Sequence, residues 1–402
     1  MSTTATATVS AAEVRERLRG GGELALLDAR ELEDHRAGHP FWAAHLPPHA
    51  LELALRLVPR RATPIVLTEV EPRVRESLAR LLDEHGYHDV AELAGGNAGW
   101  SAAGGTLHRG LCAPSKALAE RVEVPETTVD ELAGVHSAAP LVLDVRSVEE
   151  YVAGTIPGAV ACPGGELVRR AFALLAEQPA RAVVVTCAGR TRARYGARTL
   201  IEAGLPAPVS ALAGGTTAWQ AAGHDLERHA TRLAPPPAPG SDGERAATAG
   251  LTRLAARVAV PVAGAAELSR FAAEARAGER TLFLIDPRWP HDRPGAPDGP
   301  GAPHGRAELA GEDGVRAIPG GQLVEAVDEY VGTLGARIVL LDEPPFARAL
   351  PLARWLAEHD RWELRLATPA AAQAATGGVA VAGGSVVGGG EVAGAARLAV
   401  AS

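Results

Sequence analysis

The chain repeats itself, and this limits the folds it can adopt. Residues 93–104 read LAGGNAGWSAAG, and residues 212–223 read LAGGTTAWQAAG. Upstream, LLDAREL at 26–32 matches VLDVRSV at 142–148, in the same order and at nearly the same offset. Self-similarity at one spacing indicates one structural unit used more than once. We therefore expect two successive domains with the same fold.

A third and more divergent copy follows them. AIPGGQLV at 317–324 resembles ACPGGELV at 161–168, and FLIDPRW at 283–289 repeats the earlier strand signal. An insertion rich in proline and glycine at 290–305 is typical of a flexible loop. A chain of 402 residues has room for several domains. The expected divisions are 8–110 for the first domain, 122–232 for the second, 233–250 for a proline-rich linker, 251–370 for the third domain and 371–402 for a poorly ordered Ala/Gly-rich tail.

Each copy alternates short apolar runs with helical patterns. The runs at 140–145 and 181–187 are almost wholly apolar, which suits strands buried on both faces of a parallel sheet. Ala193, Ala197 and Leu200 then recur at the spacing of one helix face. The pattern predicts α/β domains in tandem, each a three-layer α/β/α unit with a parallel central sheet.

Composition excludes several functions. A net charge of -8 argues against nucleic-acid binding, and no apolar run reaches membrane-spanning length. The three cysteines, Cys112, Cys162 and Cys187, form no CxxC pair, so we expect reduced thiols in a cytoplasmic protein. The 13 histidines suggest no metal site, and no cofactor is expected.

Cys187 is the candidate nucleophile. It ends a predicted strand and precedes a helix, where parallel sheets bind ligands. Amides in the following loop are expected to form an anion-binding nest, with Arg190 and Arg192 adding charge and Thr191 a hydroxyl. Such surroundings lower a thiol pKa, whereas a purely structural cysteine would be an inert apolar residue. The expected binding residues are Ala188, Gly189, Arg190, Thr191, Arg192 and Ala193.

Three motifs of the second copy resemble the rhodanese family, and specifically its multi-domain sulfurtransferases: LDVRSVEEYVAGTIPGA at 143–159, CAGRTR at 187–192 and ALAGGTTAWQAAG at 211–223. The resemblance implies that Cys187 attacks the outer sulfur of thiosulfate, releases sulfite and carries a persulfide. Cyanide, a small thiol or a protein would then accept the sulfur. The sequence departs from the family at Thr155, where a histidine is usual.

Other positions receive structural interpretations. Asp144 and Arg146 are expected to pair and fix a strand-to-loop turn. In the first copy Glu69 stands at the place of Cys187, and in the third copy Asp342 or Glu343 does. A carboxylate cannot carry a sulfane sulfur, so both copies are expected to be inactive.

Two other functions compete with sulfur transfer. A cysteine-dependent phosphatase or arsenate reductase needs arginine at the sixth position after the cysteine, but Ala193 stands there and Arg192 comes one residue early. A non-enzymatic sensor or scaffold would fit the two altered copies. The arginines favour thiosulfate over mercaptopyruvate as donor, and residues 120–232 are expected to fold and act alone.

Overall fold

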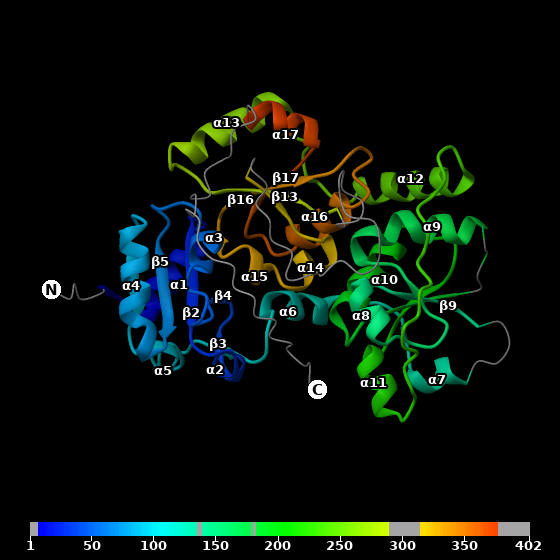
Figure 1. Cartoon of the computed structure of the whole chain (residues 1–402), viewed down its shortest axis with the longest axis horizontal. Coiled ribbons are helices and arrows are strands. Elements are labelled where there is room, and N and C mark those ends of the chain that lie inside the picture. Colours follow the sequence, from blue (N-terminus) through cyan, green and yellow to red (C-terminus); the bar gives the residue numbers. More distant parts are fainter. Residues whose placement is uncertain (1–6, 135–138, 178, 180–181, 289–313, 377–402) are drawn as a thin grey trace.

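The structure, a computed structural model, describes residues 7–134, 139–177, 179, 182–288 and 314–376. Three domains are present, and the third lies between the first and the second (Figure 1). The predicted insertion at 290–305 and the tail residues 377–402 lie outside the described residues.

The first domain contains a parallel sheet. Its elements are β1 (Ala7–Val9), α1 (Ala11–Arg19), β2 (Leu24–Ala29), α2 (Leu32–Ala37), β3 (His39–Pro40), β4 (Ala43–His45), α3 (Leu53–Leu57), β5 (Ile65–Val70), the short 3-10 helix η1 (Pro72–Val74), α4 (Arg75–Glu84), β6 (Val90–Leu93), α5 (Gly96–Ala102) and β7 (Leu107–His108). The parallel strands follow the order β1-β6-β5-β2-β4.

The second domain has the same strand order. Its elements are α6 (Ala113–Arg121), β8 (Glu126–Thr127), α7 (Val129–Ala133), β9 (Leu141–Asp144), α8 (Val148–Ala153), β10 (Val160–Ala161), the 3-10 helix η2 (Gly164–Glu166), α9 (Leu167–Glu177), β11 (Val183–Thr186), α10 (Thr191–Ala203), β12 (Val209–Leu212), α11 (Gly215–Ala221) and α12 (Asp242–Ala255). The sheet runs β8-β12-β11-β9-β10, all parallel.

The third domain repeats this order again. Its elements are α13 (Ala265–Arg276), β13 (Leu282–Asp286), β14 (Val315–Ala317), α14 (Gly320–Glu325), α15 (Val327–Tyr330), β15 (Thr333–Leu334), β16 (Arg337–Leu341), α16 (Ala349–Ala357), β17 (Glu363–Ala367) and α17 (Pro369–Thr376). The sheet runs β17-β16-β13-β14, and Val262 bridges to β17 where β8 stands in the second domain.

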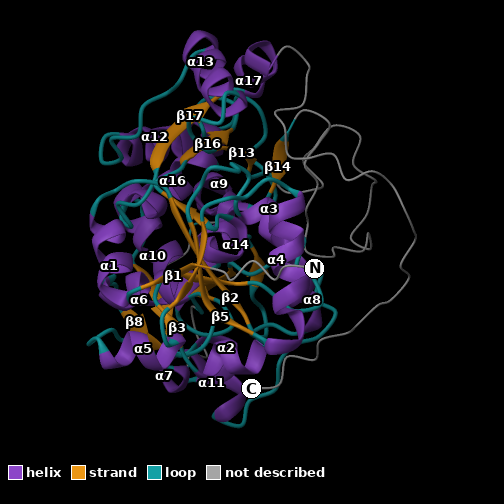
Figure 2. Ribbon diagram, turned by 90° about the vertical axis from the view of Figure 1, so that its left-hand side faces the viewer, coloured by secondary structure: helices purple, strands orange, loops and turns teal. Residues whose placement is uncertain are grey.

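The predicted three-layer architecture is confirmed, because apolar residues pack against both faces of each sheet. In β2, Leu24 and Leu26 belong to one apolar cluster, while Ala25 and Leu27 belong to another. Alternate residues point to opposite faces of a strand. Both faces of the sheet are therefore buried beneath helices (Figure 2).

The second and third domains share one core. Val185 of β11 and Leu340 of β16 lie in the same apolar cluster. Tyr195 of α10 packs on Trp355 of α16, with ring centroids 4.5 Å apart. At the boundary the repeated Pro-Gly-Gly motifs meet: a Cβ on Gly165 would lie 3.6 Å from the Cα of Gly320. Glycine permits this close approach of two backbones.

The third domain also extends the sheet of the first. Strand β15 pairs antiparallel with β2, with Thr333 opposite Ala25 and Leu334 opposite Leu24. The hydroxyl of Thr333 donates to the carbonyl of Leu57 at 3.0 Å. The third domain is thus hydrogen-bonded to the first domain and shares an apolar core with the second.

Two predicted boundaries differ from the structure. The linker expected over 233–250 ends at Ser241, whose hydroxyl caps α12 by accepting the N–H of Glu244. The expected tail likewise begins in a helix, because α17 continues to Thr376. The proline and alanine content predicted a segment without regular structure. The helices form nonetheless because α12 packs on α9 and α17 packs on α13 (Figure 1).

Candidate active site

Cys187 lies at the carboxyl edge of the second sheet. Strands β9 and β11 are parallel and in register, with Asp144 opposite Thr186. The chain then turns, and α10 begins four residues after Cys187, at Thr191. Only 2% of Cys187 is exposed. The sheet and the first turn of α10 together fix the position of its sulfur.

The loop that follows Cys187 is held by the start of α11. The N–H groups of Thr216 and Thr217 donate to the carbonyls of Cys187 and Ala188, at 2.9 and 3.0 Å. Gly215, at φ 57°, lies so close that a Cβ there would be 2.2 Å from the carbonyl oxygen of Cys187. The repeated Gly-Gly motif, which the sequence indicated only as part of the fold, therefore positions the cysteine loop.

The electrostatics of the thiol differ from the sequence expectation. Burial raises the pKa of Cys187 above its ordinary value. The charge of Arg192 and hydrogen bonds from the N–H groups of Ala193 and Gly189 act in the opposite direction. The predicted nest is thus represented by these two amides, but the prediction of a lowered pKa is wrong, because desolvation of a buried thiolate outweighs them.

Both loop arginines already have partners. Arg192, whose side chain is 10% exposed, donates from Nη1 and Nη2 to the two carboxylate oxygens of Glu150, at 2.7 and 2.9 Å. Its Nε lies 3.2 Å from an oxygen of Glu325. Arg190 lies on the surface and pairs with Glu120 at 3.0 Å. The expected role of these arginines in holding an anion stays a prediction, and in this structure each guanidinium is already paired with a carboxylate.

Asp144 and Arg146 form a buried pair beside the site. Nε and Nη2 of Arg146 donate to the Asp144 carboxylate at 3.0 and 2.7 Å, and Nη2 also donates to the carbonyl of Gly154. The hydroxyl of Thr155 donates to the same carboxylate at 2.7 Å. Thr155 therefore supplies a hydrogen bond at the position where the family usually has histidine.

Cys187 lines a pocket of about 240 Å³. Its lining residues are Lys116, Ala119, Glu120, Cys187, Gly189, Arg190, Thr191, Arg194 and Glu325. The sequence analysis missed Lys116 and Glu325, which come from α6 and from α14 of the third domain. Lys116 is the only lysine of the chain, and that rarity was the one signal that pointed to it.

The first domain has no thiol at the corresponding place. Asp28 of β2 lies opposite Glu69, just as Asp144 of β9 lies opposite Thr186. Glu69 therefore corresponds to Thr186 of the second domain, and Val70 corresponds to Cys187. The sequence offset had set Glu69 against Cys187, and a bulge between β2 and β5 explains the difference of one residue. The carboxylate of Glu69 instead accepts the N–H of Asn97 at 2.8 Å.

In the third domain a carboxylate fills the loop. Asp342 follows β16 as Cys187 follows β11, and it is 1% exposed. Its oxygens accept the N–H groups of Glu343, Arg348 and Ala349 at 2.9, 2.7 and 3.2 Å. Of the two candidates at this place, Asp342 therefore occupies the anion-binding loop, which leaves its amides no free position for a substrate.

The other cysteines are in unreactive surroundings. All three cysteines are free thiols. Burial raises the pKa of Cys162 to about 12, and burial together with nearby carboxylates raises the pKa of Cys112. Unlike Cys187, neither thiol lines the 240 Å³ pocket or has loop N–H groups that favour its thiolate. Cys162 instead packs as an apolar residue in the core that also contains Cys187.

The histidines include a pair at positions i and i+4 that the sequence analysis overlooked. The rings of His35 and His39 stack with centroids 3.8 Å apart. Nδ1 of His35 bonds to Asp28, and Nδ1 of His39 bonds to the carbonyl of His35. Within the described ranges, no three histidine, cysteine or carboxylate side chains are grouped so as to hold a metal.

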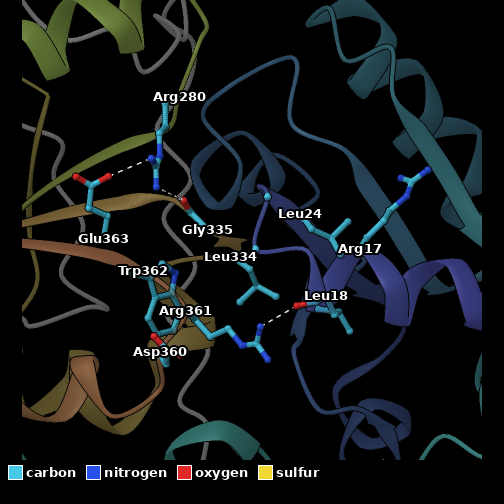
Figure 3. A pocket seen from close by; sticks show the side chains of 12 residues that line it. Arg17, Leu18, Leu24, Arg280, Leu334, Gly335, Asp360, Arg361, Trp362 and Glu363 are labelled. Atoms are coloured by element: carbon cyan, nitrogen blue, oxygen red, sulfur yellow. Dashed lines mark hydrogen bonds and ion pairs between the residues drawn. The ribbon is translucent and has the colours of Figure 1, made fainter.

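A second cavity, of about 390 Å³, lies between the first and third domains (Figure 3). Arg280 pairs there with Glu363 at 3.0 Å, and Arg361 donates to the carbonyl of Leu18 at 2.8 Å. The lining residues include no nucleophilic thiol. These paired side chains tie the two domains together, and the cavity is separate from the Cys187 pocket.

The fold and the cysteine loop define a rhodanese-type protein, and comparisons agree. The sequence model of the rhodanese-like domain matches residues 10–103 and 128–222. The chain therefore contains two copies of a rhodanese-like domain. Both matches fall in the first two domains, while the third shares their strand order. Across the described ranges, no helix is both long enough and apolar enough to span a membrane.

One solved structure resembles almost the whole chain. It is a thiosulfate sulfurtransferase from Pseudomonas aeruginosa, 36% identical, with a TM-score of 0.78. The match covers 90% of this chain and 66% of that one, so the present chain spans about two thirds of its relative.

Shorter structures match single domains. A protein of unknown function from Rhodopseudomonas palustris, described as a possible tyrosine phosphatase, is 28% identical over 30% of this chain and 97% of its own, with a TM-score of 0.25. A rhodanese-like domain from Anabaena is 29% identical over 26% and 80%, with a TM-score of 0.23. No curated protein matches the chain.

Proposed function

We propose that this protein is a thiosulfate sulfurtransferase that works through a persulfide on Cys187. The observation that carries the proposal is that Cys187 lines a pocket of about 240 Å³, where the N–H groups of Gly189 and Ala193 favour its thiolate. The similarity to a thiosulfate sulfurtransferase across 90% of the chain supports the same activity.

The reaction has two displacement steps. The Cys187 thiolate attacks the outer sulfur of thiosulfate, the S–S bond of the donor breaks, and sulfite leaves with the bonding electron pair. An acceptor, cyanide or a thiol, then attacks the outer sulfur of the persulfide, and the electron pair returns to Cys187. The amides of Gly189 and Ala193 stabilise the negative sulfur in both steps.

The surrounding side chains keep the loop rigid during these steps. The carbonyls of Cys187 and Ala188 are bound by α11, and Arg192 is held by Glu150 on α8. Because the loop does not need to reorganise, its amides are already directed at the sulfur when charge develops there. The reaction requires a reduced thiol, which fits a reducing compartment such as the cytoplasm.

The test is direct. Purified protein is mixed with thiosulfate and cyanide, and thiocyanate is measured; mass spectrometry then locates a 32 Da sulfur adduct. We expect thiocyanate formation and an adduct on Cys187. Steady-state kinetics with mercaptopyruvate should give a lower kcat/KM than with thiosulfate. Absence of thiocyanate and of the adduct would refute the assignment in favour of a sensor or scaffold.

A further inference from the structure

The charges around the Cys187 pocket leave one positive and one negative group without a full partner. Arg190 is paired with Glu120, and Arg194 is paired with Glu126 at 2.6 Å. In each of these pairs the positive and negative charges neutralise each other. The cation that remains in the lining is Lys116, for which the described part of the chain provides no carboxylate within ion-pair distance.

The negative group is Glu325. The guanidinium of Arg192 pairs with two carboxylates. Its Nη atoms donate to both oxygens of Glu150, and Glu325 contacts only its Nε. This group of three side chains therefore keeps one uncompensated negative charge. Burial raises the pKa of Glu325, which the charges of Arg192 and Lys116 only partly offset, so a cation that enters the pocket would favour its carboxylate form.

Lys116 and Glu325 reach the pocket from different elements. Lys116 is on α6, which precedes the second domain's sheet, and Glu325 ends α14 of the third domain. The two residues line the same pocket as Cys187. The Lys116 charge acts on Glu325, but the two do not pair, so a ligand that enters the pocket meets an ammonium and a carboxylate.

The size of the pocket limits the ligand. At about 240 Å³ the pocket is smaller than the roughly 300–1,000 Å³ of sites for drug-sized ligands, so it suits a small molecule. An amino acid with a short side chain has this size and carries both an anionic and a cationic group. Charge-assisted hydrogen bonds to both groups would orient it.

We propose, on the basis of the sulfur-transfer function above, that the acceptor is a small zwitterionic thiol of the amino-acid class. Its carboxylate binds Lys116, and its ammonium group binds Glu325. The acceptor thiolate, its proton lost to solvent, attacks the outer sulfur of the Cys187 persulfide. The S–S bond breaks, the electron pair stays on Cys187, and the acceptor leaves as its own persulfide.

The experiment tests the roles of the Lys116 and Glu325 charges separately. The full chain is loaded with thiosulfate and desalted, and the rate of persulfide loss is measured with four thiols. These are cysteine, cysteamine, 3-mercaptopropionate and the uncharged 2-mercaptoethanol. The proteins are the wild type, Lys116→Gln, Glu325→Gln and the control Glu329→Gln, which changes a neighbouring carboxylate outside the pocket lining. The rate of persulfide loss with each charged thiol is divided by the rate with 2-mercaptoethanol on the same protein. This ratio removes any difference between variants in the reactivity of the Cys187 persulfide.

We expect Lys116→Gln to lower the normalised rates with cysteine and 3-mercaptopropionate about tenfold, and to spare cysteamine. Glu325→Gln should lower the rates with cysteine and cysteamine by a similar factor and spare 3-mercaptopropionate. Unchanged normalised rates, equal losses for every charged thiol, or the same pattern in Glu329→Gln would overturn the proposal. If thiosulfate does not load Cys187, the donor assignment fails instead, and inorganic polysulfide loads the thiol for the same comparison.

Discussion

The guanidinium of Arg192 and the carboxylate of Glu325 lie 3.2 Å apart across the boundary between the second and third domains. Arg192 lies in the first turn of α10, directly after the cysteine loop, whereas Glu325 belongs to a domain without a thiol at the corresponding place. The third domain thus takes part in the electrostatics of the site. This relationship determines how the reactivity of Cys187 should respond to pH.

Persulfide formation should become faster as pH rises, and should still be rising at about pH 9. The nucleophile is the thiolate, and burial raises the pKa of Cys187 above its ordinary value of 9.0. Because Glu325 raises this pKa further, Glu325→Gln should shift the profile to lower pH; Arg192→Ala should shift it upward. Single-turnover loading by thiosulfate, followed by mass spectrometry across pH, measures both shifts. A profile that is flat from pH 6 to 9 would contradict the raised pKa.

Cys187→Ser should abolish thiocyanate formation and leave the fold intact, since the hydroxyl fits the site but forms no persulfide. Cys162→Ser and Cys112→Ser should retain most activity, because neither thiol contributes to the pocket lining. Circular dichroism provides the control for folding. If Cys162→Ser proved as inactive as Cys187→Ser, a two-cysteine mechanism would replace the present one.

Gly215→Ala should cost most of the activity. A methyl group there would lie 2.2 Å from the Cys187 carbonyl oxygen, so the loop must move. Gly223→Ala is the matched control: Gly223 also has a positive φ, 87°, but nothing lies within 4 Å of its Cβ position. Both variants should lose about 1–2 kcal/mol of stability from backbone strain, and Gly215→Ala should lose more because its methyl group overlaps backbone atoms. Equal kcat values for the two variants would show that Gly215 has no role in positioning the loop.

An isolated fragment of residues 120–232 should not fold stably, contrary to the sequence expectation. The hydroxyl of Tyr195 donates to the carbonyl of Ser115 at 2.5 Å, and Gly250 of α12 packs on Phe172. The fragment lacks both Ser115 and Gly250, and it exposes the face of α10 that Trp355 covers. Thermal unfolding followed by circular dichroism tests this. A cooperative transition near that of the full chain would show that the second domain is independent.

Asp328→Asn should stabilise the protein at pH 8 but not at pH 5. Burial and the charge of Glu329 raise the pKa of Asp328 to about 7, and Oδ1 has no hydrogen-bond partner. The folded state therefore holds a proton that the unfolded chain releases at lower pH, so the stability from this group is lost as pH rises from about 4 to above 7. Urea unfolding at the two pH values measures the difference. An equal change at both would exclude a titrating Asp328.

The sequence by itself determined the features that depend on neighbouring residues. Apolar runs placed the strands, and the offset between the copies placed equivalent strands and helices in each domain. Asp144 and Arg146 stand two residues apart, and their pairing follows from a short turn at a strand end. The position of Cys187 between a buried strand and a helix was predicted in the same way, because local periodicity is enough to locate it.

The tertiary structure decided which charges reach the thiol. The sequence showed Arg190 and Arg192 beside Cys187, but their partners Glu120, Glu150 and Glu325 come from other elements, and no local pattern marks them. Lys116 likewise reaches the pocket only because α6 packs on α10. The pKa of Cys187 is raised and not lowered because burial is a property of the packed domains. Desolvation and long-range ion pairs depend on what the chain brings together in space, so they were not predictable from the residues next to the cysteine.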